Sequence, residues 1–245
     1  MSEKRGRVLG VVSVKGGVGK TTTVSNLGVI LKKEHNIPCV LVDANISVPN
    51  LGLHMDMAEA ENTIQSVLEK EEASMSDAVN IHPSGVHVIP GSLSGSEIKR
   101  GSLEKKVADL ASRYGLVILD SSPGVGPEPL SVMRASDALV IVTCLDFPSI
   151  SAALKSLKYA RELGRPVLGV VLNRVRGSAD ELDLSDVKEI LSIPILGKIP
   201  EDPKVYESMF RRTPVVLFAP QSPASAAYRK LAATILETGL LTRPL

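Results

Sequence analysis

Short apolar runs rich in β-branched residues alternate along the chain with longer stretches whose apolar residues have helical spacing. The runs cover residues 8–14, 39–42, 86–89, 116–119, 138–143, 167–172 and 195–199. Such continuous apolar runs are typical of strands buried on both faces. Helical spacing covers residues 21–33, 97–113, 149–163, 184–191 and 223–236. This alternation predicts an α/β fold: a mostly parallel twisted sheet with helices on both faces, in three layers.

The pattern indicates one domain over residues 1–245, whose terminal helix spans about 223–240. With 245 residues, 44% of them hydrophobic, the chain can bury a substantial core. The looser stretches 58–84 and 174–182 are interpreted as connections or insertions within one fold. Ligands of parallel sheets bind beyond the carboxyl ends of the strands, so functional residues are expected there.

Composition narrows the function only slightly. Lys and Arg total 28 against 27 Asp and Glu, so no overall charge attracts the chain to nucleic acid or to an anionic membrane. The first apolar run is interrupted by Gly10 and Ser13, and we expect neither a secretory signal nor a membrane span. Cys39 and Cys144 are far apart in sequence and are interpreted as core residues in a reducing compartment. A cytoplasmic protein is therefore expected.

A glycine-rich segment, residues 14–22, follows the first predicted strand and opens the first predicted helix. Glycines let successive backbone N–H groups converge on phosphate oxygens, and the helix N-terminus adds partial positive charge. In this arrangement the Lys20 ammonium reaches the β- and γ-phosphates, and the Thr21 hydroxyl ligates Mg²⁺. The predicted phosphate-binding residues are Gly16, Gly17, Val18, Gly19, Lys20, Thr21 and Thr22. The segment predicts a P-loop NTPase that uses ATP and Mg²⁺.

The loop resembles the deviant Walker A loop of the MinD/ParA ATPase family, K-G-G-x-G-K-[ST], most closely in its MinD-like, septum-site-determining members. Val14 stands where the ordinary phosphate loop has its first glycine, and the extra Lys15 follows it. The resemblance implies a homodimer that encloses two ATP molecules, with Lys15 of each subunit reaching the phosphates bound by the other. A cation so placed acts as an arginine finger does, which is worth roughly 10³ to 10⁵ in rate. Lys15 and Lys20 are therefore candidate catalytic residues.

An aspartate directly follows each of two apolar strands. Asp43 ends one run, and Asp120 ends another. A carboxylate at this edge can hold a Mg²⁺-bound water, although alone it is more often a turn or cap residue. By resemblance, residues 116–126 are the Walker B and second switch segment, and residues 43–51 are the first switch. Asp43, Asp120 and Thr21 are thus the predicted magnesium residues, the two aspartates acting through water.

The first switch departs from the family pattern at its second acidic position. Where MinD-like proteins have D-x-D, this chain has Asp43, Ala44 and Asn45. By resemblance the second carboxylate orients or polarises the attacking water, and an amide is a far poorer proton acceptor. Losing one acid–base group lowers a rate by about 10² to 10⁴. We predict slow hydrolysis that relies on Asp43 or on a partner, with Asn45 a weak substitute.

The base of the nucleotide is expected at the ends of two later strands. Asn173 and Arg174 follow one, and Pro200, Glu201 and Asp202 follow the other. An asparagine carries a donor and an acceptor that can pair with adenine, and backbone groups of the second turn can add contacts. By resemblance these are the adenine-binding segments, although an asparagine after a strand is also an ordinary turn residue.

Related classes differ in features that the sequence displays. Iron–sulfur carriers of the family need paired cysteines, which Cys39 and Cys144 do not match, so no cluster is expected. Many MinD proteins end in a basic amphipathic helix on the membrane surface, whereas residues 234–245 contain one arginine, a glutamate, a glycine and a proline. That is a poor interfacial helix, and packing on the body is favoured over a peripheral position at the inner face of the membrane.

Three functions remain as alternatives. The favoured one is a MinD-like switch whose ATP-dependent dimer controls where cell division or another structure is placed, with an unidentified protein activator or cargo. The second is a ParA-like partition ATPase that binds DNA nonspecifically, for which the nearest basic pairs are Arg211 with Arg212 and Arg229 with Lys230. The third is a nucleotide-binding scaffold with little turnover, which Asn45 keeps open.

Overall fold

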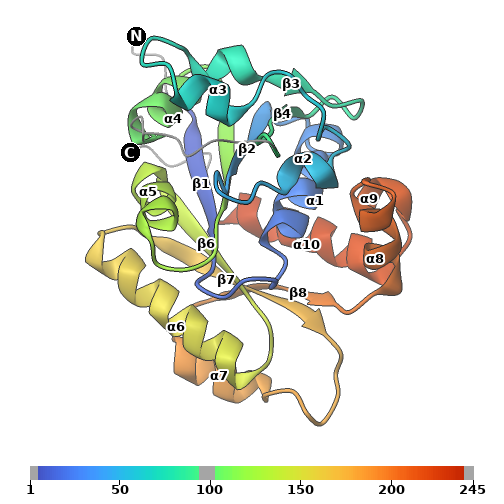
Figure 1. Cartoon of the computed structure of the whole chain (residues 1–245). Coiled ribbons are helices and arrows are strands. Elements are labelled where there is room, and N and C mark those ends of the chain that lie inside the picture. Colours follow the sequence, from blue (N-terminus) through green and yellow to red (C-terminus); the bar gives the residue numbers. More distant parts are fainter. Residues whose placement is uncertain (1–4, 94–102, 240–245) are drawn as a thin grey trace.

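One twisted sheet of eight strands organises the protein (Figure 1). The computed structural model describes residues 5–93 and 103–239. The strand order is β3-β4-β2-β5-β1-β6-β7-β8, and neighbouring strands are parallel except for the antiparallel pair β3 and β4. The strands are β1 Arg7–Val12, β2 Cys39–Ala44, β3 Asn80–Ile81, β4 His87–Ile89, β5 Leu116–Ser121, β6 Ala138–Thr143, β7 Val167–Val175 and β8 Ile195–Pro200.

Helices cover both faces of the sheet, which confirms the predicted three-layer fold (Figure 1). One core contains side chains of α3 to α7, and the other contains side chains of α1, α2, α9 and α10. The helices are α1 Lys20–Lys33, α2 Leu51–His54, α3 Ile64–Leu68, α4 Leu103–Ala111, α5 Pro127–Ala135, α6 Phe147–Glu162, α7 Leu184–Leu191, α8 Pro203–Phe210, α9 Val215–Phe218 and α10 Pro223–Glu237, with a 3₁₀ turn η1 at Met75–Ala78.

Alternation along the central strands explains why they are apolar throughout. On β1, Val8 and Val12 pack in one core, whereas Leu9 and Val11 pack in the other. Successive side chains point to opposite faces of a strand, so a strand covered on both faces must be apolar at every position.

Four helices in the second half of the chain begin at a polar cap. Asp146, Asp183, Asp202 and Ser222 precede α6, α7, α8 and α10, and each side chain accepts a backbone N–H of the first turn. Each cap satisfies a donor that the helix itself leaves unpaired. The N-terminus of α1 is different, because its cap is Gly19 and no side chain fills it.

Several boundaries differ from the predicted ones. Strand β1 ends at Val12, two residues early, because the chain there already turns toward the glycine-rich loop. The stretch 58–84, predicted as connection, contains α3, η1 and β3, and helices α5, α8 and α9 were not predicted. The predicted helix 97–113 is observed as α4, while residues 97–102 lie outside the described residues. The terminal helix, predicted to reach about residue 240, is α10 and ends at Glu237, and residues 240–245, for which packing on the body was favoured, also lie outside the described residues.

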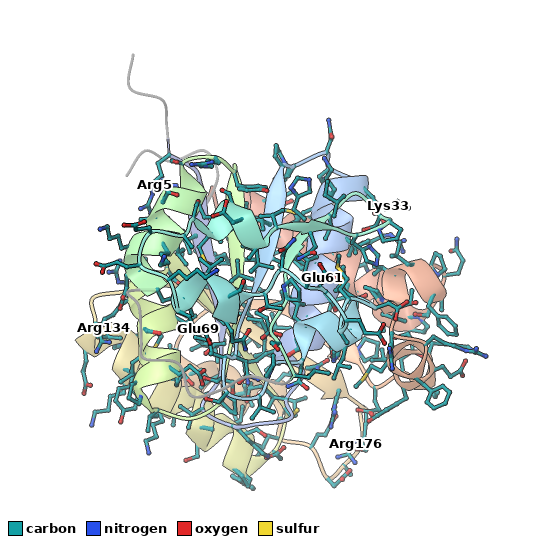
Figure 2. The ribbon with its side chains drawn as sticks, turned by 45° about the horizontal axis from the view of Figure 1, so that its top comes forward. Arg5, Lys33, Glu61, Glu69, Arg134 and Arg176 are labelled. Carbon is teal, nitrogen blue, oxygen red and sulfur yellow. The ribbon has the colours of Figure 1, made fainter. Side chains whose placement is uncertain are left out.

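Charged side chains are spread around the periphery. Lys33 lies on α1 and Arg134 on α5, whereas Glu61, Glu69 and Arg176 lie outside helices and strands; Figure 2 labels all five, and all five are exposed. Within residues 5–93 and 103–239, no helix is both long enough and apolar enough to cross a membrane. Neither cysteine forms a disulfide: Cys39 is buried, as predicted, and Cys144 is partly buried.

Candidate functional site

A cavity of about 520 Å³ lies at the carboxyl ends of the central strands. Its size is that of a small-molecule site. It brings together most of the residues predicted from the glycine-rich loop, the first switch and the two later strand ends. Its lining includes Gly16, Gly17, Gly19, Lys20, Thr21, Thr22, Asn45, Asn173, Arg174, Pro200, Glu201 and Asp202. Lys15, Val18, Asp43 and Asp120 lie behind or beside this surface and are outside the lining.

Two glycines shape the loop between β1 and α1. Gly17 and Gly19 have φ angles of 73° and 96°, a left-handed conformation that side chains disfavour. Gly19 also packs closely, since a Cβ there would lie 2.1 Å from Nδ2 of Asn173. Because Gly19 leaves the first turn of α1 uncapped, backbone N–H groups face the cavity, as an anion site requires.

Lys20, the first residue of α1, is buried with 7% exposure. Burial lowers the pKa of its ammonium, and the nearby Asp120 carboxylate partly opposes this. A cation held in a poorly solvated position gains from an anionic ligand, because the ligand replaces the hydration that the lysine lost. Lys20 is thus suited to phosphate, and its role as a phosphate-binding residue stays a prediction.

Asp43 and Asp120 are neighbours across β2 and β5, in direct register. Both are fully buried, but their partners differ. Asp43 accepts backbone N–H groups of Asn45, Asn50 and Leu51, so both of its oxygens hold the first switch in shape. Within residues 5–93 and 103–239, neither oxygen of Asp120 has a partner at hydrogen-bond geometry, although the Thr21 hydroxyl is close enough to affect its pKa.

The isolation of Asp120 is the main electrostatic feature of the site. Burial raises its pKa to about 6, while the Thr21 hydroxyl and the Lys20 ammonium nearby act to lower it. Burial and then the Asp120 carboxylate raise the pKa of Asp43 well above its usual value, against the three N–H groups. A buried carboxylate without a partner lowers the stability of the folded protein, and a bound cation can offset this cost. Asp120 beside Thr21 therefore fits a Mg²⁺ ion or its bound water, whereas Asp43 is occupied in this conformation.

Asn45 is turned into its own loop. Its amide nitrogen donates to the carbonyl of Val48, which also accepts from the side chain of Asn50 at 2.8 Å. Ser47, in the same loop, donates its backbone N–H to Glu128 at 2.9 Å. The amide of Asn45 therefore shapes the loop, and its oxygen is the group left for a water.

Lys15 lies beside α6 of its own chain. Its ammonium contacts Asp146 at 3.0 Å and donates to the Ser149 hydroxyl at 2.8 Å. The side chains of Lys15 and Asp146 are 38% and 45% exposed, so solvent screens this pair. In this conformation Lys15 is held within the subunit and faces away from the lining of its own cavity.

The base side of the cavity is built by the ends of β7 and β8. Asn173 donates its amide N–H to the loop carbonyl of Val18 at 2.8 Å, which leaves its oxygen to accept from a ligand. Both carboxylate oxygens of Asp202 accept backbone N–H groups, from Lys204 and Ala224. The side chain of Asp202 is thus structural, and only its backbone is available to a base.

Sequence reasoning missed several residues of the lining. One of them is Tyr206 of α8, whose ring centroid lies 6.0 Å from the guanidinium carbon of Arg174. The Tyr206 hydroxyl donates a hydrogen bond to the Glu201 carboxylate at 2.5 Å. His54 of α2 lines the cavity as well, and burial lowers its pKa to about 4, so it is neutral at pH 7. Glu128, Val205 and Met209 were missed as well, whereas Ser47, Val48, Asn50, Ser121, Ser122 and Pro123 lie in the predicted switch segments 43–51 and 116–126. The unassigned helix α8 explains three of these misses.

Known proteins resemble this chain over nearly its whole length. A family model described as the CobQ/CobB/MinD/ParA nucleotide binding domain matches residues 9–215. An uncharacterized ATP-binding protein of Methanocaldococcus jannaschii is 36% identical over 231 residues, which are 93% of this chain and 87% of that protein.

Solved structures agree with this match. The cell division ATPase MinD of Pyrococcus furiosus superposes with a TM-score of 0.90 at 28% identity, covering 95% of this chain and 99% of that one. The septum site-determining protein MinD of Pyrococcus horikoshii, complexed with Mg-ADP, gives 0.89 at 26% identity, covering 97% and 99%.

Proposed function

The chain belongs to the CobQ/CobB/MinD/ParA nucleotide binding domain family, and from this premise we propose that it is a MinD-like ATP switch. In this proposal one subunit binds ATP with Mg²⁺, two subunits pair around two nucleotides, and slow hydrolysis separates them. The cycle regulates where cell division or another cellular structure is placed, and an unidentified protein is the activator or cargo.

One observation carries the nucleotide part of the proposal. In the part of the chain that the structure describes, Asp120 is buried without a partner at hydrogen-bond geometry, at the foot of a glycine-shaped loop and next to the buried cation Lys20. Thr21 and Asp120 are the residues that would hold Mg²⁺, and the loop N–H groups with Lys20 would hold the phosphates. The bound ion would neutralise phosphate charge. The Mg-ADP in the MinD of P. horikoshii supports this choice of ligand.

Lys15 supports the pairing part of the proposal. Within its own subunit it contacts only residues at the start of α6, Asp146 and Ser149, in the described part of the chain. To act on a nucleotide held by the second subunit it must leave these residues. The ion pair is half-exposed and contributes at most about 1 kcal/mol, so phosphate charge can outcompete it.

Slow turnover follows from the first switch. Asn45 lacks a carboxylate, its amide nitrogen is bound to Val48, and the neighbouring Asp43 has both oxygens on backbone N–H groups. Asp43 as a catalytic or metal residue remains a proposal that requires a rearrangement of this loop. The low-turnover scaffold differs from the switch only in the rate of hydrolysis.

The DNA-binding alternative has less support. Arg229 pairs with Glu34 at 2.8 Å, and Arg212 lies 3.7 Å from Asp56, so acidic residues offset part of each basic pair. A nonspecific DNA surface requires unpaired cations that displace counterions. Membrane-surface binding stays a proposal, since residues 240–245 lie outside the described residues.

Nucleotide binding and turnover test the proposal together. Calorimetric titration of the full chain is expected to show ATP binding that requires Mg²⁺ for full affinity and is lost in Lys20→Ala. Steady-state phosphate release is expected to be slow and to rise about 10-fold or more in Asn45→Asp. Absence of ATP binding would refute the proposed function, and equal turnover in wild type and Asn45→Asp would refute the explanation for slow hydrolysis.

A further inference from the structure

Glu128 connects the two switch segments across the mouth of the cavity. It is the second residue of α5, directly after the second switch, and it lines the cavity together with Asn45 and Ser47 of the first switch. Its Oε1 accepts the Ser47 backbone N–H at 2.9 Å and lies 3.4 Å from the Ser47 hydroxyl. These groups are 81 residues apart in sequence, so only the fold brings them together.

The position of Glu128 favours the ionised form of its carboxylate. It lies in the first turn of α5, where the helix dipole stabilises a negative charge. The side chain is half-buried, and its Oε2 has no hydrogen-bond partner among the described residues. One oxygen therefore positions the loop while the other remains free to accept.

The other carboxylates at or behind the cavity have different surroundings: buried Asp120 lies beside Thr21 and Lys20, where we propose that it serves Mg²⁺. Asp202 accepts two backbone N–H groups, and Glu201 accepts the Tyr206 hydroxyl on the base side. Asp43 accepts three backbone N–H groups of the first switch. Among the lining residues described, Glu128 is the carboxylate that contacts the loop of Asn45, through Ser47, and keeps one oxygen without a partner.

We propose that Glu128 supplies the carboxylate that Asn45 lacks, and this inference rests on the proposed ATP switch. Oε1 holds the first switch through Ser47, and Oε2 accepts a hydrogen bond from the attacking water. The water oxygen forms a bond to the γ-phosphorus while the bond from that phosphorus to the bridging oxygen breaks. ADP leaves with the electron pair, and the water proton passes to Glu128 and then to solvent.

The test uses the full chain and the substitution Glu128→Gln, which keeps an oxygen for the Ser47 N–H but is a far weaker proton acceptor. Turnover is expected to fall at least 10-fold, with the affinity for a non-hydrolysable ATP analogue unchanged. Glu189→Gln, an exposed residue of α7, is the matched control and should keep wild-type turnover. In an Asn45→Asp background, Glu128→Gln should have little effect, because the restored carboxylate replaces it.

A second readout separates chemistry from loop positioning. The chain contains no tryptophan, so Val48→Trp, at a position 64% exposed in the first switch, provides a single fluorophore. Adding Glu128→Gln to this protein should leave the tryptophan emission unchanged in ADP, and it should also leave the emission unchanged in the ATP analogue. By contrast, Glu128→Ala should alter the emission by releasing Ser47.

The outcomes are distinct for the two proposals. A wild type that does not bind ATP refutes the ATP switch itself. A wild type that binds ATP but has turnover within twofold of Glu128→Gln, or no turnover at all, overturns only the role of Glu128. A Glu128→Gln defect that Asn45→Asp fails to rescue, accompanied by altered tryptophan emission, also overturns it, because the residue then acts on loop structure alone.

Discussion

Replacing Asp120 with asparagine should stabilise the protein without ligand while removing its response to Mg²⁺ and ATP. Among the residues that the structure describes, none meets the Asp120 carboxylate at hydrogen-bond geometry, and burial raises its pKa from a usual value of 3.8 to about 6. At 1.36 kcal/mol per pH unit, this difference corresponds to about 3 kcal/mol of lost stability when the group is ionised. Asparagine has the same shape and no charge, so we expect a gain of about 1–3 kcal/mol, or roughly 2–12 °C in Tm.

The pH dependence gives the sign of the effect. A folded-state pKa above the unfolded value means that the native protein binds more protons between pH 4 and 6. The ionised Asp120 therefore lowers the free energy of unfolding above pH 6, and this loss of stability disappears as the pH falls toward 4. The stability gap between Asp120→Asn and wild type should be full at pH 7.5 and should close by about pH 4.

Denaturant unfolding and thermal melts without Mg²⁺, from pH 4.5 to 8, measure this gap. Asp186→Asn on the exposed side of α7 is the matched control and should shift stability little. With Mg²⁺ and ATP, wild type should gain stability and Asp120→Asn should not. The reasoning would be refuted if the ligand-free variant were less stable than wild type at pH 7.5, or if it kept the full stabilisation by Mg²⁺ and ATP.

Two further predictions concern the loop and its lysine. Asp146→Asn keeps a good N-cap for α6 but removes the charge that holds Lys15. The ATP concentration at which subunits pair, measured by light scattering, should therefore fall up to about fivefold. An unchanged or higher ATP concentration would contradict this prediction. Gly19→Ala forces a side chain into a left-handed backbone and against Asn173, so melts should show a loss of about 1–3 kcal/mol and titrations a loss of ATP binding. Gly126→Ala, where the added methyl has open space, is its control, and equal effects at both glycines would contradict the steric argument.

The parallel strands of the sheet and the glycine-rich loop could be predicted from local sequence. The apolar runs identify the parallel strands because burial on both faces requires them, and the glycine-rich loop is recognisable because phosphate binding needs glycine and lysine at fixed spacing. These features depend on neighbouring residues along the chain. Helix α8 was missed because it is only eight residues long and its apolar residues form no buried face: Tyr206, Met209 and Phe210 are exposed, and Ser208 is its buried residue.

The hydrogen-bond and ion-pair partners of the site residues could not be predicted from the sequence, because they depend on contacts between distant segments. The Asp43 carboxylate is filled by backbone N–H groups that the folded loop presents, whereas Asp120 has none, although both follow apolar strands. Lys15 meets Asp146 only because β1 and β6 are neighbours in the sheet. The contact between Glu128 and Ser47 arises in the same way from β2 and β5.

The pairing of two subunits around ATP is tested most directly by molar mass. Size-exclusion chromatography with light scattering, in ADP and in a non-hydrolysable ATP analogue with Mg²⁺, should give a monomer of about 26 kDa in ADP and a dimer of twice that mass with the analogue. Lys15→Ala should bind the analogue with nearly wild-type affinity yet remain mostly monomeric. A wild type that stays monomeric with saturating analogue would contradict the account.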